Sequence, residues 1–263
     1  MSTFHIPELA PDVLLMVGNF PITNTMVNVW IALLFFLVLG IFIRRSVSLR
    51  PRKLQNFFEY ILESVLNTFD QVTGERKKTL KFLPIVGTIF FFILISNWIG
   101  LLPGVGAVTF DGKEFFRPAN TDLNLTVVMA LVAVIGSHIA GLFTVGVFTH
   151  IGKFIQIGGI VKSFKKGPIG IFAALVEFMV GILEIVGEMA KVLSLSLRLF
   201  GNIFAGEVLI IVIRSLVGIL VPTPFMMLEL LVGLIQAAVF AILTLVYFTV
   251  ATSQPHGAEE GAH

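Results

Sequence analysis

The chain has 263 residues, of which 56% are hydrophobic and only 13% are charged, and its formal net charge at pH 7 is +2. A soluble domain of this size carries about 25% charged residues, so the composition indicates a polytopic membrane protein. The small net charge gives no reason to expect a nucleic-acid partner, and the lack of cysteine excludes disulfides and thiolate metal sites.

Five segments are apolar enough to cross a bilayer, which takes about 20 residues of helix. They lie at about 26–43, 82–103, 123–148, 169–214 and 225–252. The fourth is roughly twice as long as one crossing requires, so it either extends beyond the hydrocarbon or crosses at a steep inclination. The sequence therefore predicts an all-α fold with five transmembrane helices, the last two long and inclined.

Basic residues gather after the first span, at Arg44 and Arg45, and again after the third, between Lys153 and Lys166. The positive-inside rule places these segments on the cytoplasmic side. Residues 1–25 are then expected outside, and the polar tail 253–263 in the cytoplasm.

Residues 51–72 show an amphipathic helical pattern. Leu54, Phe57 and Phe58 begin an apolar stripe, and Glu59 and Glu63 lie on the opposite face. This pattern predicts a helix lying in the membrane interface. An ordinary amphipathic helix in a soluble linker is the alternative.

The fourth span contains a permanent charge. Placing Arg198 at the bilayer centre costs roughly 2.5–3.5 kcal/mol on insertion scales, and a guanidinium cannot become neutral by losing a proton. Further polar side chains share these two helices: Glu184, Glu188, Lys191, Ser194, Asn202 and Glu207 in the fourth span, and Glu229, Gln236 and Tyr247 in the fifth. Membrane helices this polar usually line water or an ion path. Interhelical ion pairs, such as Glu188–Lys191, are the structural alternative.

The run Ser196-Leu197-Arg198-Leu199-Phe200-Gly201-Asn202, followed by Ala205-Gly206-Glu207, closely resembles the signature of subunit a of rotary F-type ATP synthases. The resemblance extends to Glu184 and Lys191, to Ile235-Gln236-Ala237 and Leu245-Val246-Tyr247 in the last span, and to Asn97 in the second. It implies a non-catalytic stator that carries protons or sodium ions past a ring of c subunits. It further implies b-type peripheral stalk subunits as partners, a bacterial plasma membrane as the location, and no cofactor.

The resemblance also implies roles for individual residues. Arg198 corresponds to the essential stator arginine, and the residues expected to support it are Asn202, Ser194, Lys191 and Tyr247. The external proton path is expected to contain Glu207, Glu229, Gln236 and Asn97, and the cytoplasmic path Glu184 and Glu188. Glu229 stands where some relatives have histidine. His138, in the third span, matches no motif. It either lines the external path or hydrogen-bonds a neighbouring helix.

Two other classes of protein fit the composition less well. An ion-coupled secondary transporter would use Glu184, Glu207 and Glu229 as a relay, but the sequence has no internal repeat of the kind such folds show. A membrane-embedded hydrolase would need a metal-spaced histidine cluster or a Ser–His motif, and the sequence has neither.

Overall fold

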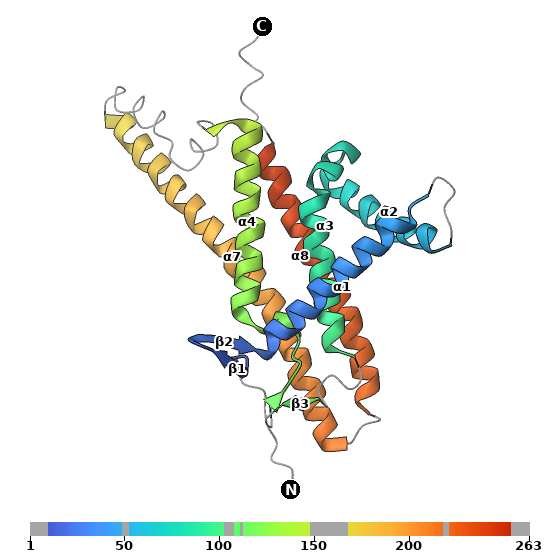
Figure 1. Ribbon diagram of the computed structural model, residues 1–263. Coiled ribbons are helices and arrows are strands. Elements are labelled where there is room, and N and C mark those ends of the chain that lie inside the picture. The colour runs from blue at the N-terminus through green and yellow to red at the C-terminus, as the bar shows by residue number, and fades with distance from the viewer. Residues whose placement is uncertain are drawn as a thin grey trace. The chain divides into compact units, whose positions relative to one another are not determined.

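The computed structural model describes residues 10–48, 53–102, 108–110, 113–147, 168–217 and 221–253 (Figure 1). Its α-helices are α1 (Asn24–Ser46), α2 (Lys53–Thr73), α3 (Arg76–Gly100), α4 (Leu123–Val145), α7 (Pro168–Val217) and α8 (Pro222–Thr252). The shorter elements are the antiparallel pair β1 (Val13–Val17) and β2 (Phe20–Thr23), the pair β3 (Thr109–Phe110) and β4 (Lys113–Glu114), and the 3₁₀ helix η2 (Ala119–Thr121).

Five helices in these ranges are long and apolar enough to cross a membrane. They cover Asn24–Arg45, Arg76–Gly100, Leu123–Val145, Phe178–Leu216 and Pro222–Thr252. The predicted class, an all-α polytopic membrane protein, is therefore confirmed. The second of these helices starts before the expected residue 82, because the charged turn at Arg76 is already helical although it is not apolar.

Some expectations concern segments outside the described residues. These are residues 1–9, residues 49–52 with the start of the amphipathic segment, the loop 148–167 with its lysines, and residues 254–263 of the tail.

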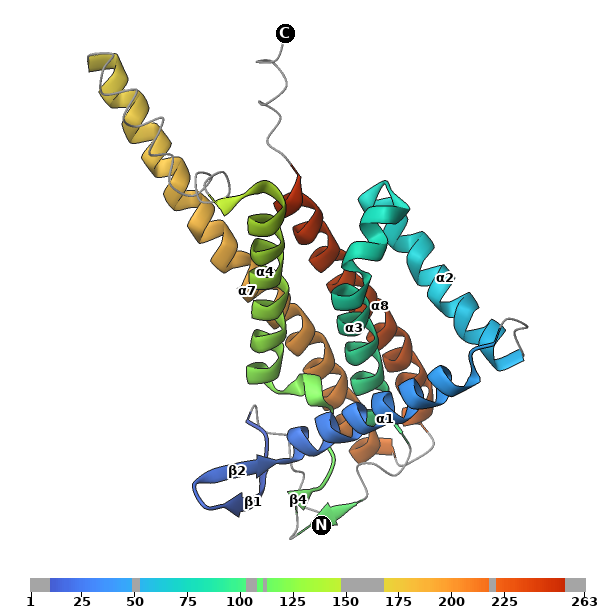
Figure 2. The same cartoon turned by 45° about the horizontal axis from the view of Figure 1, so that its top comes forward.

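The chain forms two compact units. The first comprises Met1–Thr126 and Ser196–Leu245, and the second comprises Val127–Leu195 and Val246–His263. In the first unit α1 packs on α3, and η2 packs against both helices. Figure 2 shows the β1–β2 hairpin at the start of α1.

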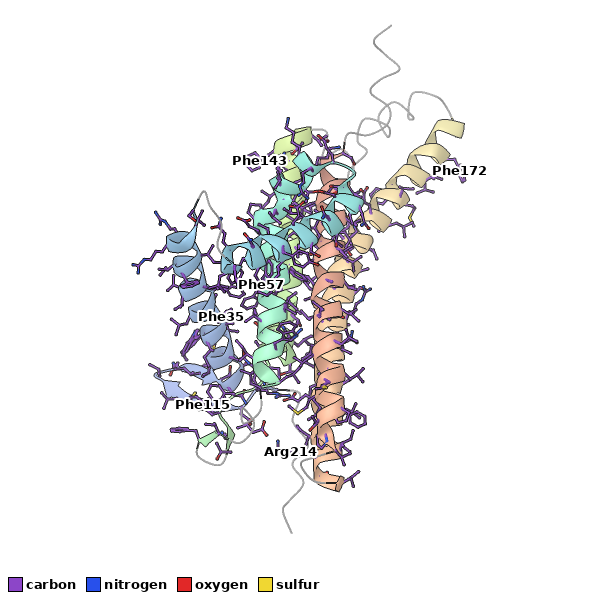
Figure 3. The ribbon with its side chains drawn as sticks, turned by 90° about the vertical axis from the view of Figure 1, so that its right-hand side faces the viewer. Phe35, Phe57, Phe115, Phe143, Phe172 and Arg214 are labelled. Carbon is purple, nitrogen blue, oxygen red and sulfur yellow. The ribbon has the colours of Figure 1, made fainter. Side chains whose placement is uncertain are left out.

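The carboxyl end of helix α2 is held against the start of α3. Gly74 has a φ of +71°, the left-handed conformation that ends helices, and its N–H donates to the Asp70 carbonyl at 2.8 Å. The Arg76 guanidinium then pairs with Asp70 at 2.7 Å and also with Glu63. Leu66 and Phe69 of α2 are buried, whereas Phe57 is exposed (Figure 3). An interfacial position for this helix remains a prediction.

The second unit consists of α4 after its first turn, the first part of α7 and the last residues of α8. Large apolar side chains point outward from these segments. Phe143 of α4 is 88% exposed and Phe172 of α7 is 69% exposed (Figure 3). Outward-facing apolar side chains of this kind are typical of helices surrounded by lipid.

Candidate functional site

Arg198 lies on an exposed face of α7. Ser194, Asn202 and Ala205 share this exposed face, whereas Leu199 on the other side of the helix is fully buried. The sequence produces this division because residues four apart along a helix lie on one face. Arg198 therefore lies on the surface of the chain and not in its core.

The surface next to Arg198 is smooth. A Cβ atom built on Gly201 would meet no atom within 4 Å, so no described part of the chain covers this position. Small residues allow another helix to approach closely in a membrane. The smooth surface around an exposed cation is therefore suited to a neighbouring helix.

Asn202 connects α7 to α8 within the first unit. Its Nδ2 donates to Oε1 of Gln236 at 2.7 Å. Gln236 is buried, and its Nε2 has no hydrogen-bond partner among the described residues. Two predicted site residues are thus brought together, and one buried donor remains available.

Glu207 forms a buried ion pair with Arg117. Nε of Arg117 lies 3.1 Å from Oε1 and 3.3 Å from Oε2 of Glu207, and Nη2 lies 3.1 Å from Oε2. The side chains are 3% and 9% exposed. A guanidinium that contacts both carboxylate oxygens is the strongest common arrangement of such a pair.

The sequence analysis did not single out Arg117. It precedes η2, in a connection that contains acids and bases in similar number, and its partner is 90 positions away along the chain. The structure fixes it from three further sides. Its Nη1 donates to the Ala10 carbonyl at 3.1 Å, its own carbonyl accepts from Asn28 at 3.0 Å, and its Cζ lies 5.9 Å from the centre of the Phe204 ring.

Glu229, on α8, lies against α7 at Gly206. It is 9% exposed, and its Oε1 has no hydrogen-bond partner within the described residues. A Cβ atom on Gly206 would collide with the Glu229 carboxylate. Because Gly206 and Glu207 are adjacent in the chain, both acids approach the same turn of α7.

Asn97 joins three segments of the first unit. Its Oδ1 accepts from Nδ2 of Asn120 at 2.7 Å, and its Nδ2 donates to the Gly233 carbonyl at 3.4 Å. The neighbouring Oγ of Ser96 and Oδ1 of Asn120 are buried and have no partner in the described ranges. The end of α3 thus brings a set of polar atoms close to α8.

A separate polar cluster lies in the second unit. Nε2 of His138 is 3.1 Å from Oε2 of Glu188, and Nζ of Lys191 is 2.6 Å from Oε1 of the same carboxylate. The Lys191 ammonium also lies 5.3 Å from the centre of the Tyr247 ring. The Glu188–Lys191 ion pair and a hydrogen bond from His138 to a neighbouring helix, both considered as alternatives, are present. Glu184 is half-buried on the same helix.

This cluster joins residues that the sequence analysis had separated. His138 was expected on the external path and Glu188 on the cytoplasmic one, yet their side chains are hydrogen-bonded to each other. The described residues contain no group of three or more His, Asp or Glu side chains that could hold a metal ion.

Residues 26–249 match a family model described as ATP synthase A chain. The chain belongs to this family. It is 32% identical over 240 residues to ATP synthase subunit a of Syntrophobacter fumaroxidans, a match that covers 91% of this chain and 88% of the relative. It is 33% identical to subunit a of Citrifermentans bemidjiense over 233 residues, or 89% of each chain.

The family predicted from the Arg198 motif is therefore confirmed. With its five apolar helices, the chain is a multi-pass membrane protein of the membrane sector of ATP synthase. The relatives named above are bacterial.

Gly206→Ala tests the fit between Glu229 and α7. We expect a loss of about 1–3 kcal/mol of unfolding free energy, because the added methyl group displaces a buried carboxylate. The measurement is unfolding of the purified complex in mixed detergent and dodecyl sulfate micelles. Gly201→Ala is the matched control. It fills open space on the same helix and should stabilise slightly. Equal effects of the two substitutions would contradict the packing described.

Proposed function

We propose that this chain is the stator subunit a of a rotary ATP synthase. In this proposal it is not catalytic itself, and it provides two offset half-channels that carry protons to and from the carboxylates of a ring of c subunits. Arg198 separates the two paths. The observation that carries the proposal is the exposure of the Arg198 guanidinium beside the open Gly201 position on a membrane-length helix in this family.

The charge of Arg198 explains how a rotor acid could release its proton. At about 4 Å and an effective dielectric constant near 20, a carboxylate and a guanidinium attract each other by about 4 kcal/mol. That energy is close to the insertion cost of the arginine, so the pair can form and separate again as the ring turns. The fixed cation also repels protons, and the ion must therefore travel with the ring.

Five buried polar atoms support an external half-channel in the first unit. They belong to Asn28, Ser96, Asn120, Glu229 and Gln236, and none has a hydrogen-bond partner within the described residues. Buried polar atoms are normally satisfied by protein or by water. A water-lined inlet past Asn97, Glu207 and Glu229 toward Gln236 would satisfy them. Arg44 and Arg45 in the last turn of α1 mark that end as cytoplasmic. The opposite end of α1, which contains Asn28, then faces outward.

The cluster around Glu188 supports a cytoplasmic half-channel. His138 lies about 22 Å along α4 from Leu123, beyond the middle of a bilayer core of about 30 Å. We therefore assign His138 to the cytoplasmic path with Glu188 and Glu184, in place of the external position expected from sequence. Lys191 holds the Glu188 carboxylate from its other side, and the Lys191 ammonium in turn lies over the Tyr247 ring.

The partners and the location follow from the same proposal. The partners are a ring of c subunits, b-type peripheral stalk subunits and the lipid bilayer, and the carried ion is a proton or a sodium ion. The location is a bacterial plasma membrane, with the amino terminus outside and the carboxyl terminus in the cytoplasm. Residues 1–25 form the external segment, 26–252 the membrane domain and 253–263 the cytoplasmic tail.

Arg198→Ala should abolish ATP-driven proton pumping by the assembled complex in proteoliposomes, because the rotor acid loses its counter-ion. Pumping is measured by quenching of a pH-sensitive dye. Arg214→Ala is the matched control, since Arg214 is an exposed arginine in the last turn of the same helix (Figure 3). Normal pumping by Arg198→Ala would end the proposal.

Gly201→Leu should leave the chain folded but block rotation, because its side chain projects into the space proposed for the ring. We expect assembly at the normal level and ATP-driven pumping reduced by at least about tenfold. Gly40→Leu, on α1, fills a position equally open in the structure and should pump normally. Full activity of Gly201→Leu would place the ring elsewhere.

Glu188→Gln tests whether the His138–Glu188–Lys191 cluster carries protons or only joins helices. A proton-carrying role predicts a fall in pumping of roughly 100-fold, the usual effect of removing a proton-transfer group. Glu59→Gln, at an exposed acid of α2, is the control. Unchanged pumping with a lowered unfolding midpoint would show that the ion pair is purely structural.

A further inference from the structure

The two acids near Gly206 have different surroundings. Both carboxylate oxygens of Glu207 accept hydrogen bonds from Arg117. Oε1 of Glu229 is buried and has no partner among the described residues. Both acids were expected on the external path, and the geometry gives them different surroundings.

Arg117 cannot release Glu207 by changing its own charge, because a guanidinium keeps its proton in proteins. The position of Arg117 is also fixed. Its Nη1 donates to the Ala10 carbonyl, and its main-chain carbonyl accepts from the buried Asn28 amide. The remaining charges that act on Glu207 are the acids Asp12 and Glu114. The Asn24 amide contacts both of these residues, at 3.4 Å from an Asp12 carboxylate oxygen and 3.3 Å from the Glu114 carbonyl.

A buried ion pair held on both oxygens is a stable charged arrangement, and breaking it leaves a charge without compensation. A buried carboxylate without a donor is poorly placed to hold a charge and well placed to take up a proton. Glu229 belongs to α8, and its carboxylate meets α7 at Gly206 only through space, so its side chain reaches the path independently of Glu207.

We propose that Arg117 is a positioning residue that keeps Glu207 as a fixed carboxylate, and that Glu229 is the acid that takes up and passes on protons at the external side. This inference rests on the proposed function and assigns different tasks to the two acids. Glu207 stays ionised in its ion pair with Arg117 and does not carry the proton, and Glu229 binds and releases the mobile proton.

The test uses the assembled complex in vesicles, stripped of its soluble sector, and measures passive proton conduction with a pH-sensitive dye. Arg117→Gln and Glu207→Gln should each lower conduction by at least about tenfold, because each leaves one buried charge unpaired. The double variant R117Q/E207Q should recover to within about threefold of the wild type, because it removes both charges together. Glu229→Gln should lose conduction with the ion pair intact.

Lys113→Gln is the control for loop charge, since this neighbouring lysine contacts the Val13 carbonyl and not Glu207. An assembled R117Q/E207Q variant that stays inactive would overturn the proposal, because Glu207 would then itself carry protons. Normal conduction by Glu229→Gln would overturn it as well. If R117Q/E207Q fails to assemble, a second neutral pair, R117M/E207L, is tested in its place. If neither assembles, Glu229→Gln decides alone.

Arg198→Ala, measured by ATP-driven pumping of the complete complex in proteoliposomes, keeps the two proposals apart. Normal pumping by this variant would contradict the stator function itself, whatever the Arg117 variants do. If Arg198→Ala abolishes pumping and R117Q/E207Q does not recover conduction, the function stands and only the division of tasks between the acids fails.

Discussion

A charge in an apolar medium must be solvated by something, and this chain meets that requirement in two opposite ways. Arg117 is 3% exposed and is held by a carboxylate, a carbonyl and an aromatic ring of its own chain. Arg198 is exposed on α7, on a face that it shares with Ser194, Asn202 and Ala205. The first arginine is buried in the fold, whereas the second lies on an exposed face, where the proposed function has it meet a rotor carboxylate. The polar groups of the first unit are arranged around this difference.

Glycine contributes to both arrangements through the atom it lacks. At Gly206 the missing Cβ gives the Glu229 carboxylate room against α7, and at Gly201 it keeps the surface beside Arg198 flat. The two positions lie in one motif, yet one is filled from inside the chain and the other is open. Helical spacing alone cannot tell them apart, because it shows which residues share a face but not which face is covered.

The sequence was sufficient to predict the fold class, since apolar length alone identifies membrane helices. It also brought out Arg198, Asn202 and Gln236, because polar residues are conspicuous in apolar helices. It could not predict the Arg117–Glu207 pair. A loop arginine among mixed charges has no periodic signature, and its partner comes from another helix far along the chain. Nor could it predict which residue His138 contacts, because its partner Glu188 belongs to another helix.

The bond from Arg117 to the Ala10 carbonyl has a mechanical consequence. Ala10 lies three residues before the start of the β1–β2 hairpin, and the carbonyl of Asp12 accepts from the Asn24 N–H at the start of α1. Any force that shifts this hairpin also withdraws an acceptor that orients the guanidinium. The β1–β2 hairpin is thus coupled, through the Ala10 carbonyl and Arg117, to the buried Glu207 carboxylate.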